Sequence, residues 1–170
     1  MTTKLDKLAD NVVQLLIEKN ATLSTAESCT GGLISEKITA VSGSSSVFGF
    51  GVCTYANEAK MKLLGVAEET LSSVGAVSEE TAVAMASGIK RLSGSDFSVS
   101  VTGIAGPTGA VEGKPVGTVY IGIATPKKTY AKRFLFTGET FPDEESKRSA
   151  IRAEAAYAAL SMIKEEIEEL

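Results

Sequence analysis

The amino-acid sequence predicts a single α/β domain with a mixed sheet of about five or six strands between helices. The chain has 170 residues, about the size of one domain, and its 44% hydrophobic and 22% charged residues are typical of a globular protein. Segments with helical spacing alternate with short runs rich in β-branched residues, which end at glycine-rich turns. We therefore expect one domain over residues 1–170.

The first segments predict a helix, a strand, a glycine turn and a second helix. The apolar residues of the first helix recur on one face: Leu5, Leu8, Val12, Leu15 and Leu16. This helix is expected over 3–20, followed by a strand over 21–26 and a helix over 33–41. Ligands of α/β proteins bind at the carboxyl ends of strands, and a helix start offers free N–H groups, so the turn at 27–32 is a candidate site.

The same criteria predict the remaining elements. Asn57 and Ser78 are expected to cap helices, and the last helix starts at Ser146. The predicted elements are a small-residue loop at 42–46, a strand at 47–55, short helices near 57–64 and 68–74, a helix at 78–92, a strand at 97–102, a glycine-rich loop at 103–117, strands at 118–125 and 130–137 joined as a hairpin, a polar loop at 138–145 and a final helix from 146 to the end.

The composition excludes several classes of chemistry. No histidine is present, which excludes Ser-His-Asp and Cys-His catalysis and histidine-ligated metals. Cys29 and Cys53 have no CxxC spacing, and two free thiols without a signal peptide predict a cytoplasmic location. The net charge of −4 argues against direct nucleic-acid binding. No apolar run reaches the roughly 18 residues of a membrane span.

Without histidine, a serine nucleophile needs a lysine whose pKa is lowered. Ser28 is the candidate nucleophile because it lies at the strand-to-helix turn, and Lys60 is the candidate base because it follows the next strand, with Tyr55 nearby to relay a proton. The alternatives are that Ser28 is a helix N-cap and that Lys60 is a surface lysine paired with a carboxylate.

Three further features favour a bound phosphate or ribose. The backbone and hydroxyl of the loop that begins at Thr102 resemble a phosphate cradle in composition, but the loop lacks the Walker spacing. Lys114 is its nearest cation. Arg148 and Arg152 lie one turn apart on the last helix and can clamp a phosphate, or alternatively pair with Glu144, Glu145 or Glu154.

Six segments together resemble the CinA C-terminal domain family and cover nearly the whole chain. They are TAESCTGG at 25–32, GSS at 43–45, YANEAK at 55–60, GAVSEE at 75–80, TGIAGP at 102–107 and KPVGTV at 114–119. The match is to the stand-alone form, without the larger N-terminal domain of some members. The resemblance implies a three-layer α/β/α sandwich with a mostly parallel sheet. It also implies hydrolysis of nicotinamide mononucleotide to nicotinate mononucleotide and ammonia.

The resemblance also implies roles for individual residues. Ser28 is the nucleophile, Lys60 the base and Tyr55 the assisting residue. Arg148 matches the family's arginine, although the extended loop at 139–147 leaves Arg152 as the other choice. The expected substrate-binding residues are Thr30, Gly31, Gly32, Ser44, Ser45, Thr102, Gly103, Arg148 and Arg152, with N–H groups near Thr30 to Gly32 holding the oxyanion.

No metal or cofactor is expected. The partners expected are a small-molecule nucleotide substrate and further copies of the chain, as a dimer or trimer. Two other functions are consistent with the sequence. One is a thiol enzyme that uses Cys29, and the other is a non-catalytic nucleotide-binding or competence- and damage-associated interaction module.

Overall fold

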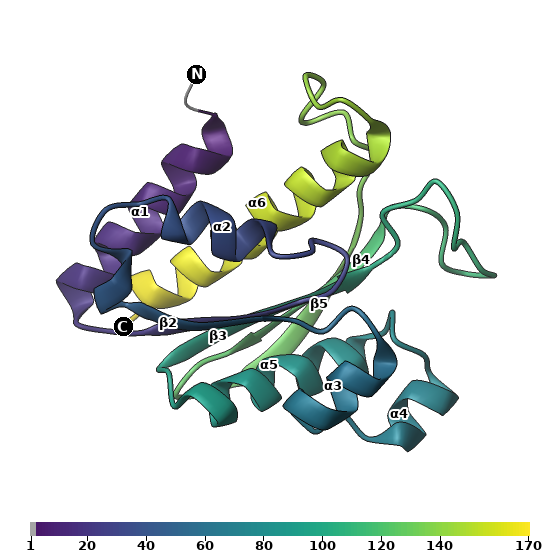
Figure 1. Ribbon diagram of the computed structural model, residues 1–170, viewed down its shortest axis with the longest axis horizontal. Helices are drawn as coiled ribbons and strands as arrows, with labels where there is room; N and C mark the ends of the chain where they lie inside the picture. The colour runs from purple at the N-terminus through teal and green to yellow at the C-terminus, as the bar shows by residue number, and fades with distance from the viewer. Residues whose placement is uncertain (1–2) are drawn as a thin grey trace.

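The computed structural model describes residues 3–170, which form a central sheet with helices on both of its faces (Figure 1). The elements in chain order are α1 (Lys4–Lys19), β1 (Leu23–Glu27), α2 (Leu33–Thr39), the 3-10 helix η1 (Ser44–Ser46), β2 (Phe48–Cys53), α3 (Asn57–Leu64), α4 (Glu68–Ser73), α5 (Glu79–Ser93), β3 (Phe97–Gly103), β4 (Thr118–Ala124), β5 (Thr129–Leu135) and α6 (Lys147–Glu168).

The five strands lie in the order β2-β1-β3-β4-β5. β1 pairs in parallel with β2 and β3, whereas β4 is antiparallel to both β3 and β5. Four strands therefore point the same way and only β4 runs against them. Figure 1 shows α1, α2 and α6 on one face of the sheet and α3, α4 and α5 on the other. The predicted mixed, mostly parallel α/β/α sandwich is confirmed.

The two faces of β3 differ in chemistry because alternate residues point to opposite layers. Val99 and Val101 belong to the apolar core that also contains residues of α1 and α6. On the other face, the buried hydroxyls of Ser98 and Ser100 donate to carbonyls of α5, at Ala86 (2.7 Å) and Ala82 (2.6 Å). These hydrogen bonds satisfy the buried hydroxyls and fix α5 closely against the sheet.

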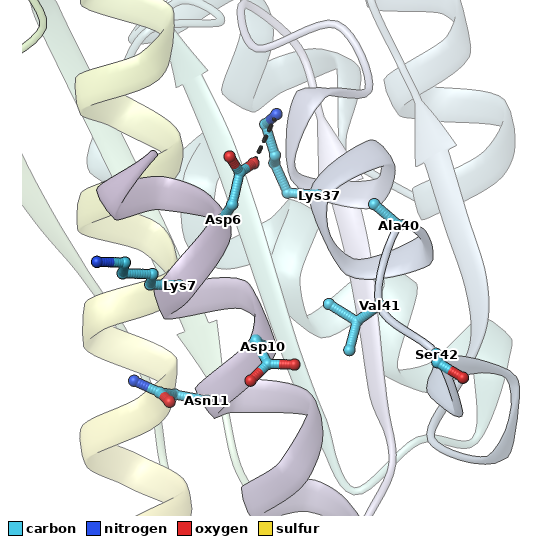
Figure 2. Close-up of a pocket in the computed structure, with 8 residues that line it drawn as sticks. All are labelled: Asp6, Lys7, Asp10, Asn11, Lys37, Ala40, Val41 and Ser42. Carbon is cyan, nitrogen blue, oxygen red and sulfur yellow. Dashed lines mark ion pairs between the residues drawn. The ribbon is translucent and has the colours of Figure 1, made fainter. Parts of the chain in front are cut away.

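An ion pair joins α1 and α2, which cover the same face of the sheet (Figure 2). Asp6 on α1 lies 2.9 Å from the ammonium of Lys37 on α2. Asp6 also forms a capping box with Thr3, whose backbone N–H donates to the carboxylate at 2.7 Å. The Thr3 N–H, followed by the ion pair, lowers the pKa of Asp6 from 3.8 to about 2.

The predicted elements agree with the observed ones to within a few residues, and Ser78 caps α5 as expected. The last helix was expected to start at Ser146, which is the N-cap of α6. The cap expected at Asn57 is wrong, because α3 already begins there and Ala56 is its N-cap. Since β2, β1 and β3 are parallel, their carboxyl ends lie at the same end of the sheet. The segments that contain Ser28, Tyr55 and Thr102 lie at this end.

Candidate active site

Ser28 lies directly after β1, on a turn that only glycine can complete easily. Its N–H donates to the Val101 carbonyl of β3 at 2.9 Å, which ties the start of the turn to the sheet. Gly31 and Gly32 then adopt φ of +60° and +95°, in the left-handed region that disfavours other residues. Gly32 is the N-cap of α2, so the alternative that Ser28 is a helix cap is wrong.

The carboxylate of Glu27 caps α2 from inside the protein. Glu27 is fully buried and accepts hydrogen bonds from the N–H groups of Gly32 and Ile34, both at 3.1 Å, and of Ser35 at 2.9 Å. The Ser35 hydroxyl also donates to it at 2.7 Å. A buried negative charge is stable here because it meets several donors at the positive end of a helix. This role of Glu27 was not predicted from the sequence.

Lys60 reaches Ser28 from the other side of the turn. Its side chain is only 1% exposed, and Nζ lies 3.1 Å from Ser28 Oγ. Nζ also donates to the backbone carbonyls of Thr54 at 2.7 Å and Tyr55 at 3.4 Å. Lys60 forms no ion pair among residues 3–170, so the alternative of a surface lysine paired with a carboxylate is wrong.

Burial lowers the pKa of Lys60 below its ordinary value of 10.5, because the charged ammonium loses its hydration. The nearby Cys29 acts in the opposite direction and only partly offsets this effect. A lysine with a lowered pKa is neutral over more of the pH range, and a neutral amine can accept a proton.

Tyr55 and Arg148 meet at the entrance of a cavity that Ser28 and Lys60 also line. Tyr55 is 64% exposed, and its hydroxyl accepts a hydrogen bond from Arg148 at 3.0 Å. The same guanidinium donates to the carbonyl of Gly106 in the loop after β3. The Tyr55 hydroxyl therefore contacts Arg148, and it is the backbone carbonyl of Tyr55 that contacts Lys60.

Arg152 holds the backbone of the Ser28 turn. It donates to the carbonyls of Cys29 at 3.2 Å and Thr30 at 2.7 Å, and it does not line the cavity. Of the two arginines, the structure thus places Arg148 at the cavity and Arg152 behind the turn. Both donate to groups other than carboxylates, so the alternative that they pair with acidic residues is wrong.

The end of β3 and the loop after it form the opposite wall. Thr102 is buried and its hydroxyl donates to the Ala76 carbonyl at 2.7 Å, while Gly103 lines the cavity beside it. A side chain at Gly103 would lie 2.6 Å from Val119, so glycine is required there. Lys114 does not line the cavity, because its ammonium donates to the Val74 carbonyl at the end of α4, at 2.9 Å.

These residues enclose a cavity of about 310 Å³. Asn57, at the start of α3, lines it as well. This residue was expected only to cap a helix, although its place between Tyr55 and Lys60 in the chain is a signal for the site. Among residues 3–170, the lining contains two basic side chains, Lys60 and Arg148, and no carboxylate, although the whole chain is acidic. The residues that line the cavity are Ser28, Cys29, Tyr55, Asn57, Lys60, Ala76, Val77, Thr102, Gly103, Ile104, Ala105, Gly106, Thr108, Gly109 and Arg148.

Several residues expected to bind substrate lie outside this cavity. Ser44 and Ser45 belong to η1, which precedes β2 and therefore lies at the amino ends of the parallel strands, opposite Ser28. The N–H of Gly31 donates to the Ser28 carbonyl, and that of Gly32 donates to Glu27. Thr30, Gly31 and Gly32 themselves do not line the cavity. Of the three N–H groups expected at 30–32, that of Thr30 alone lacks an acceptor within residues 3–170.

Cys29 lines the cavity but its thiol is buried, with 6% of the residue exposed. Loss of hydration raises the pKa of this thiol to about 12, and Arg152 offsets only part of the effect. A thiol with this pKa is almost entirely protonated at neutral pH and is a poor nucleophile. The geometry therefore disfavours a thiol mechanism.

Three other observations concern the rest of the described chain. Within residues 3–170, no group of three or more acidic or cysteine side chains is placed to hold a metal ion, and no helix is both long and apolar enough to cross a membrane. An open groove of about 750 Å³ lies beside the C-terminal end of α2 (Figure 2), whereas Ser28 precedes its N-terminal end.

Known proteins share both the sequence and the fold. Residues 5–167 match the family model described as CinA C-terminal domain. A CinA-like protein from Kosmotoga olearia is 50% identical over 159 residues, which make up 94% of this chain and 37% of that protein. The chain thus spans little more than a third of the length of the curated relatives it matches.

Two crystal structures cover almost the whole chain. A CinA superfamily protein from Klebsiella pneumoniae has a TM-score of 0.90 and 32% identity, over 99% of this chain and 100% of that one. A competence/damage inducible protein from Agrobacterium tumefaciens has a TM-score of 0.87 and 38% identity, over 95% of this chain and 94% of that one. The chain therefore belongs to the CinA C-terminal domain family.

Proposed function

We propose that the chain is an amidohydrolase that converts nicotinamide mononucleotide to nicotinate mononucleotide and ammonia, with Ser28 as nucleophile and Lys60 as base. One observation carries the proposal: the buried Lys60 amine lies 3.1 Å from the Ser28 hydroxyl and has no carboxylate partner among residues 3–170. A serine is activated when a neutral amine accepts its proton at this distance.

In the first half of the reaction, Lys60 takes the Ser28 proton as Oγ attacks the carboxamide carbon. The N–H of Thr30 is the donor expected to hold the oxyanion, since those of Gly31 and Gly32 already have acceptors. The tetrahedral intermediate collapses, the C–N bond breaks, and the proton held by Lys60 passes to the leaving nitrogen. The products of this step are ammonia and an acyl ester on Ser28.

In the second half, Lys60 takes a proton from water, which attacks the ester carbon. The C–O bond to Ser28 then breaks, and the proton returns to Oγ as the carboxylate product leaves. The guanidinium of Arg148, in a described lining without a carboxylate, supports a substrate that carries a phosphate, and Arg148 is the exposed donor at the entrance. None of these steps needs a metal or cofactor.

The test is ammonia release from nicotinamide mononucleotide by the purified protein, with and without EDTA. We expect activity that EDTA does not change, and a loss of at least roughly 1000-fold in kcat for Ser28→Ala and Lys60→Ala. Lys62→Ala is the matched control, because Lys62 is an exposed lysine on the same helix and should leave kcat unchanged.

Two outcomes would overturn the proposal. Full activity of Ser28→Ala would exclude Ser28 as nucleophile. A wild-type protein that is stabilised by the nucleotide against heat, but releases no ammonia, would instead indicate a binding module.

A further inference from the structure

Arg152 is a cation beside the Ser28 turn to which the proposed reaction gives no role. It lies on α6, which the buried residues Ile151 and Ala155 hold in the core. Within residues 3–170 the guanidinium forms no ion pair, and its hydrogen bonds go only to backbone carbonyls of the turn. Its positive charge is therefore directed at carbonyl oxygens and is not neutralised by a described carboxylate.

The two contacts of Arg152 suit the shape of a guanidinium. Nε donates to the Cys29 carbonyl at 3.2 Å and Nη2 to the Thr30 carbonyl at 2.7 Å, so one planar group holds two successive peptide units. The turn passes close to this group, because a Cβ at Gly31 would lie 3.4 Å from Nη2. A lysine offers a single nitrogen on a flexible stem and cannot fix both peptide planes in the same way.

The contact with the Cys29 carbonyl decides where the Thr30 N–H points. These two groups belong to the same peptide unit, which is trans, so they point in opposite directions. Since Arg152 holds the carbonyl from α6, the N–H points away from Arg152, and it has no acceptor among residues 3–170. Cys29 itself lines the cavity. The contact thus leaves a free donor on the side of this peptide unit that is remote from Arg152.

The same contact polarises the peptide unit. A charged donor at the carbonyl oxygen draws electron density from the amide nitrogen, and hydrogen bonds in series strengthen one another. The N–H of Cys29 also lacks an acceptor among the described residues, but the carbonyl of its peptide unit, that of Ser28, accepts from the neutral N–H of Gly31 at 3.0 Å. Of these two free N–H groups, only that of Thr30 belongs to a peptide unit that contacts a cation.

We propose that Arg152 is a positioning residue for the reaction, which aims and polarises the Thr30 N–H for the oxyanion that forms when Ser28 attacks the substrate. This role rests on the proposed function, whereas the geometry of the peptide unit does not. Arg152 does not line the cavity. An oxyanion donor acts most strongly on the charge that develops in the transition state, so Arg152 should affect kcat and not KM.

Steady-state kinetics of ammonia release test this role with Arg152→Met, which keeps a long side chain but removes the donors. We expect kcat to fall at least about 30-fold while KM stays within about threefold, since an oxyanion donor typically contributes roughly 100- to 1000-fold. Arg152→Lys should recover part of the loss, because it restores a charged donor without the planar fork. If Arg152→Met does not fold, Arg152→Lys still provides the split between kcat and KM.

The matched control is Arg91→Met. Arg91 also donates to a backbone carbonyl, that of Leu64 at 3.2 Å, but it lies at the end of α5 and does not line the cavity. This variant should leave kcat unchanged. A second readout is the pH midpoint of kcat/KM, which reports on Lys60. It should stay at the wild-type value in Arg152→Met, whereas a turn that loses its structure would displace Ser28 from Lys60 and move the midpoint.

Nuclear magnetic resonance tests the peptide unit without substrate. The carbonyl carbon of Cys29 and the amide nitrogen of Thr30 should both change chemical shift in Arg152→Met and not in Arg91→Met. If these shifts change but the wild type releases no ammonia, the proposed function fails and the polarised peptide unit stands. Unchanged shifts, a wild-type kcat in folded Arg152→Met, or a moved pH midpoint would overturn the role of Arg152.

Discussion

Lys60 has partners that suit both of its protonation states. The neutral amine has two N–H groups for the carbonyls of Thr54 and Tyr55, and its lone pair then faces Ser28 Oγ. The ammonium has a third N–H, which points to the same oxygen. A proton can therefore pass between Ser28 and Lys60 without movement of either side chain, as a general base requires.

The lowered pKa of Lys60 predicts the direction of the pH dependence. The neutral amine is the active form, so kcat/KM should rise with pH and level off with a midpoint below 10.5. The measurement is a pH–rate profile from about pH 6 to 10. Lys60→Arg should lack activity throughout, and a wild-type midpoint at the ordinary lysine value would contradict the proposed role.

The same shift predicts how Lys60 affects stability. The unfolded chain keeps the Lys60 proton up to 10.5, whereas the folded protein releases it at lower pH. In the interval between these two pKa values, the unfolded state binds more protons, so the free energy of unfolding should rise with pH. Urea unfolding of wild type and Lys60→Met should show this rise in the wild type only.

Cys29 is expected to be dispensable for the reaction. Its thiol is buried and has a pKa raised to about 12, so Cys29→Ala should retain kcat/KM to within about threefold. Treatment with iodoacetamide, followed by the ammonia assay, provides the measurement. Inactivation that substrate prevents, and that Cys29→Ala abolishes, would support the thiol mechanism instead.

At the scale of elements, α2 shows how a helix start can be used for structure and not for ligand binding. The N-terminus of a helix is an anion site in many α/β proteins, and we expected it to serve the substrate. In this chain the buried carboxylate of Glu27 already occupies it, through Gly32, Ile34 and Ser35. α2 therefore fixes the turn that carries Ser28, and the guanidinium of Arg148 supplies the positive charge of the cavity.

Glu27→Gln tests this positioning role. The amide would place two N–H donors against the N–H groups of α2, so we expect a loss of about 1–3 kcal/mol in the free energy of unfolding. Because the Ser28 turn would shift, kcat should fall by more than KM changes. Glu36→Gln, an exposed residue of the same helix, is the control and should alter neither quantity. An unchanged kcat in a folded Glu27→Gln protein would contradict the role.

The contact between α1 and α2 predicts a loss of stability in acid. Asp6→Asn removes the ion pair with Lys37 and weakens the cap, and should cost about 1 kcal/mol near neutral pH. The folded pKa of Asp6 is about 2 and the ordinary value 3.8, so this contribution is complete above 3.8 and lost as the pH falls towards 2.

Urea unfolding at several pH values measures this effect. The difference between wild type and Asp6→Asn should disappear at the lowest pH. Asp10→Asn, an exposed residue on the same helix, should show little difference at any pH.

At the scale of the whole molecule, the layer of α3, α4 and α5 depends on α5 packing closely against the sheet. Gly122 on β4 leaves room for α5: a Cβ there would overlap the Ala82 carbonyl oxygen and lie 2.5 Å from Ser100 Oγ. Gly122→Ala should therefore cost roughly 1–3 kcal/mol of stability, measured by urea unfolding. Gly49→Ala on β2, an end strand of the sheet, should leave the free energy of unfolding unchanged, because no atom lies within 4 Å of the added Cβ.

Much of the fold could be predicted from the sequence because it depends on local patterns. Apolar spacing and β-branched runs predicted the α-helices and the strands, and the serines at 78 and 146 marked two helix starts. The 3-10 helix η1 was expected to be a loop. The cap predicted at Asn57 was wrong because asparagine, although suited to capping, is here the first residue of α3 and follows the cap. The partners of Lys60 and Arg148 were harder to predict, since each comes from a segment far away in the chain.

The sequence by itself determined the alternation of helices and strands, the absence of histidine chemistry, and the family. These properties depend on residue types and on spacing along the chain. Only the tertiary structure decided that Arg148 faces the cavity while Arg152 holds the turn, that Glu27 takes the start of α2, and that Ser44 and Ser45 lie at the other end of the sheet. Two arginines one helical turn apart look equivalent in sequence. They differ because the packing of α6 directs one towards the loop after β3 and the other towards the loop after β1.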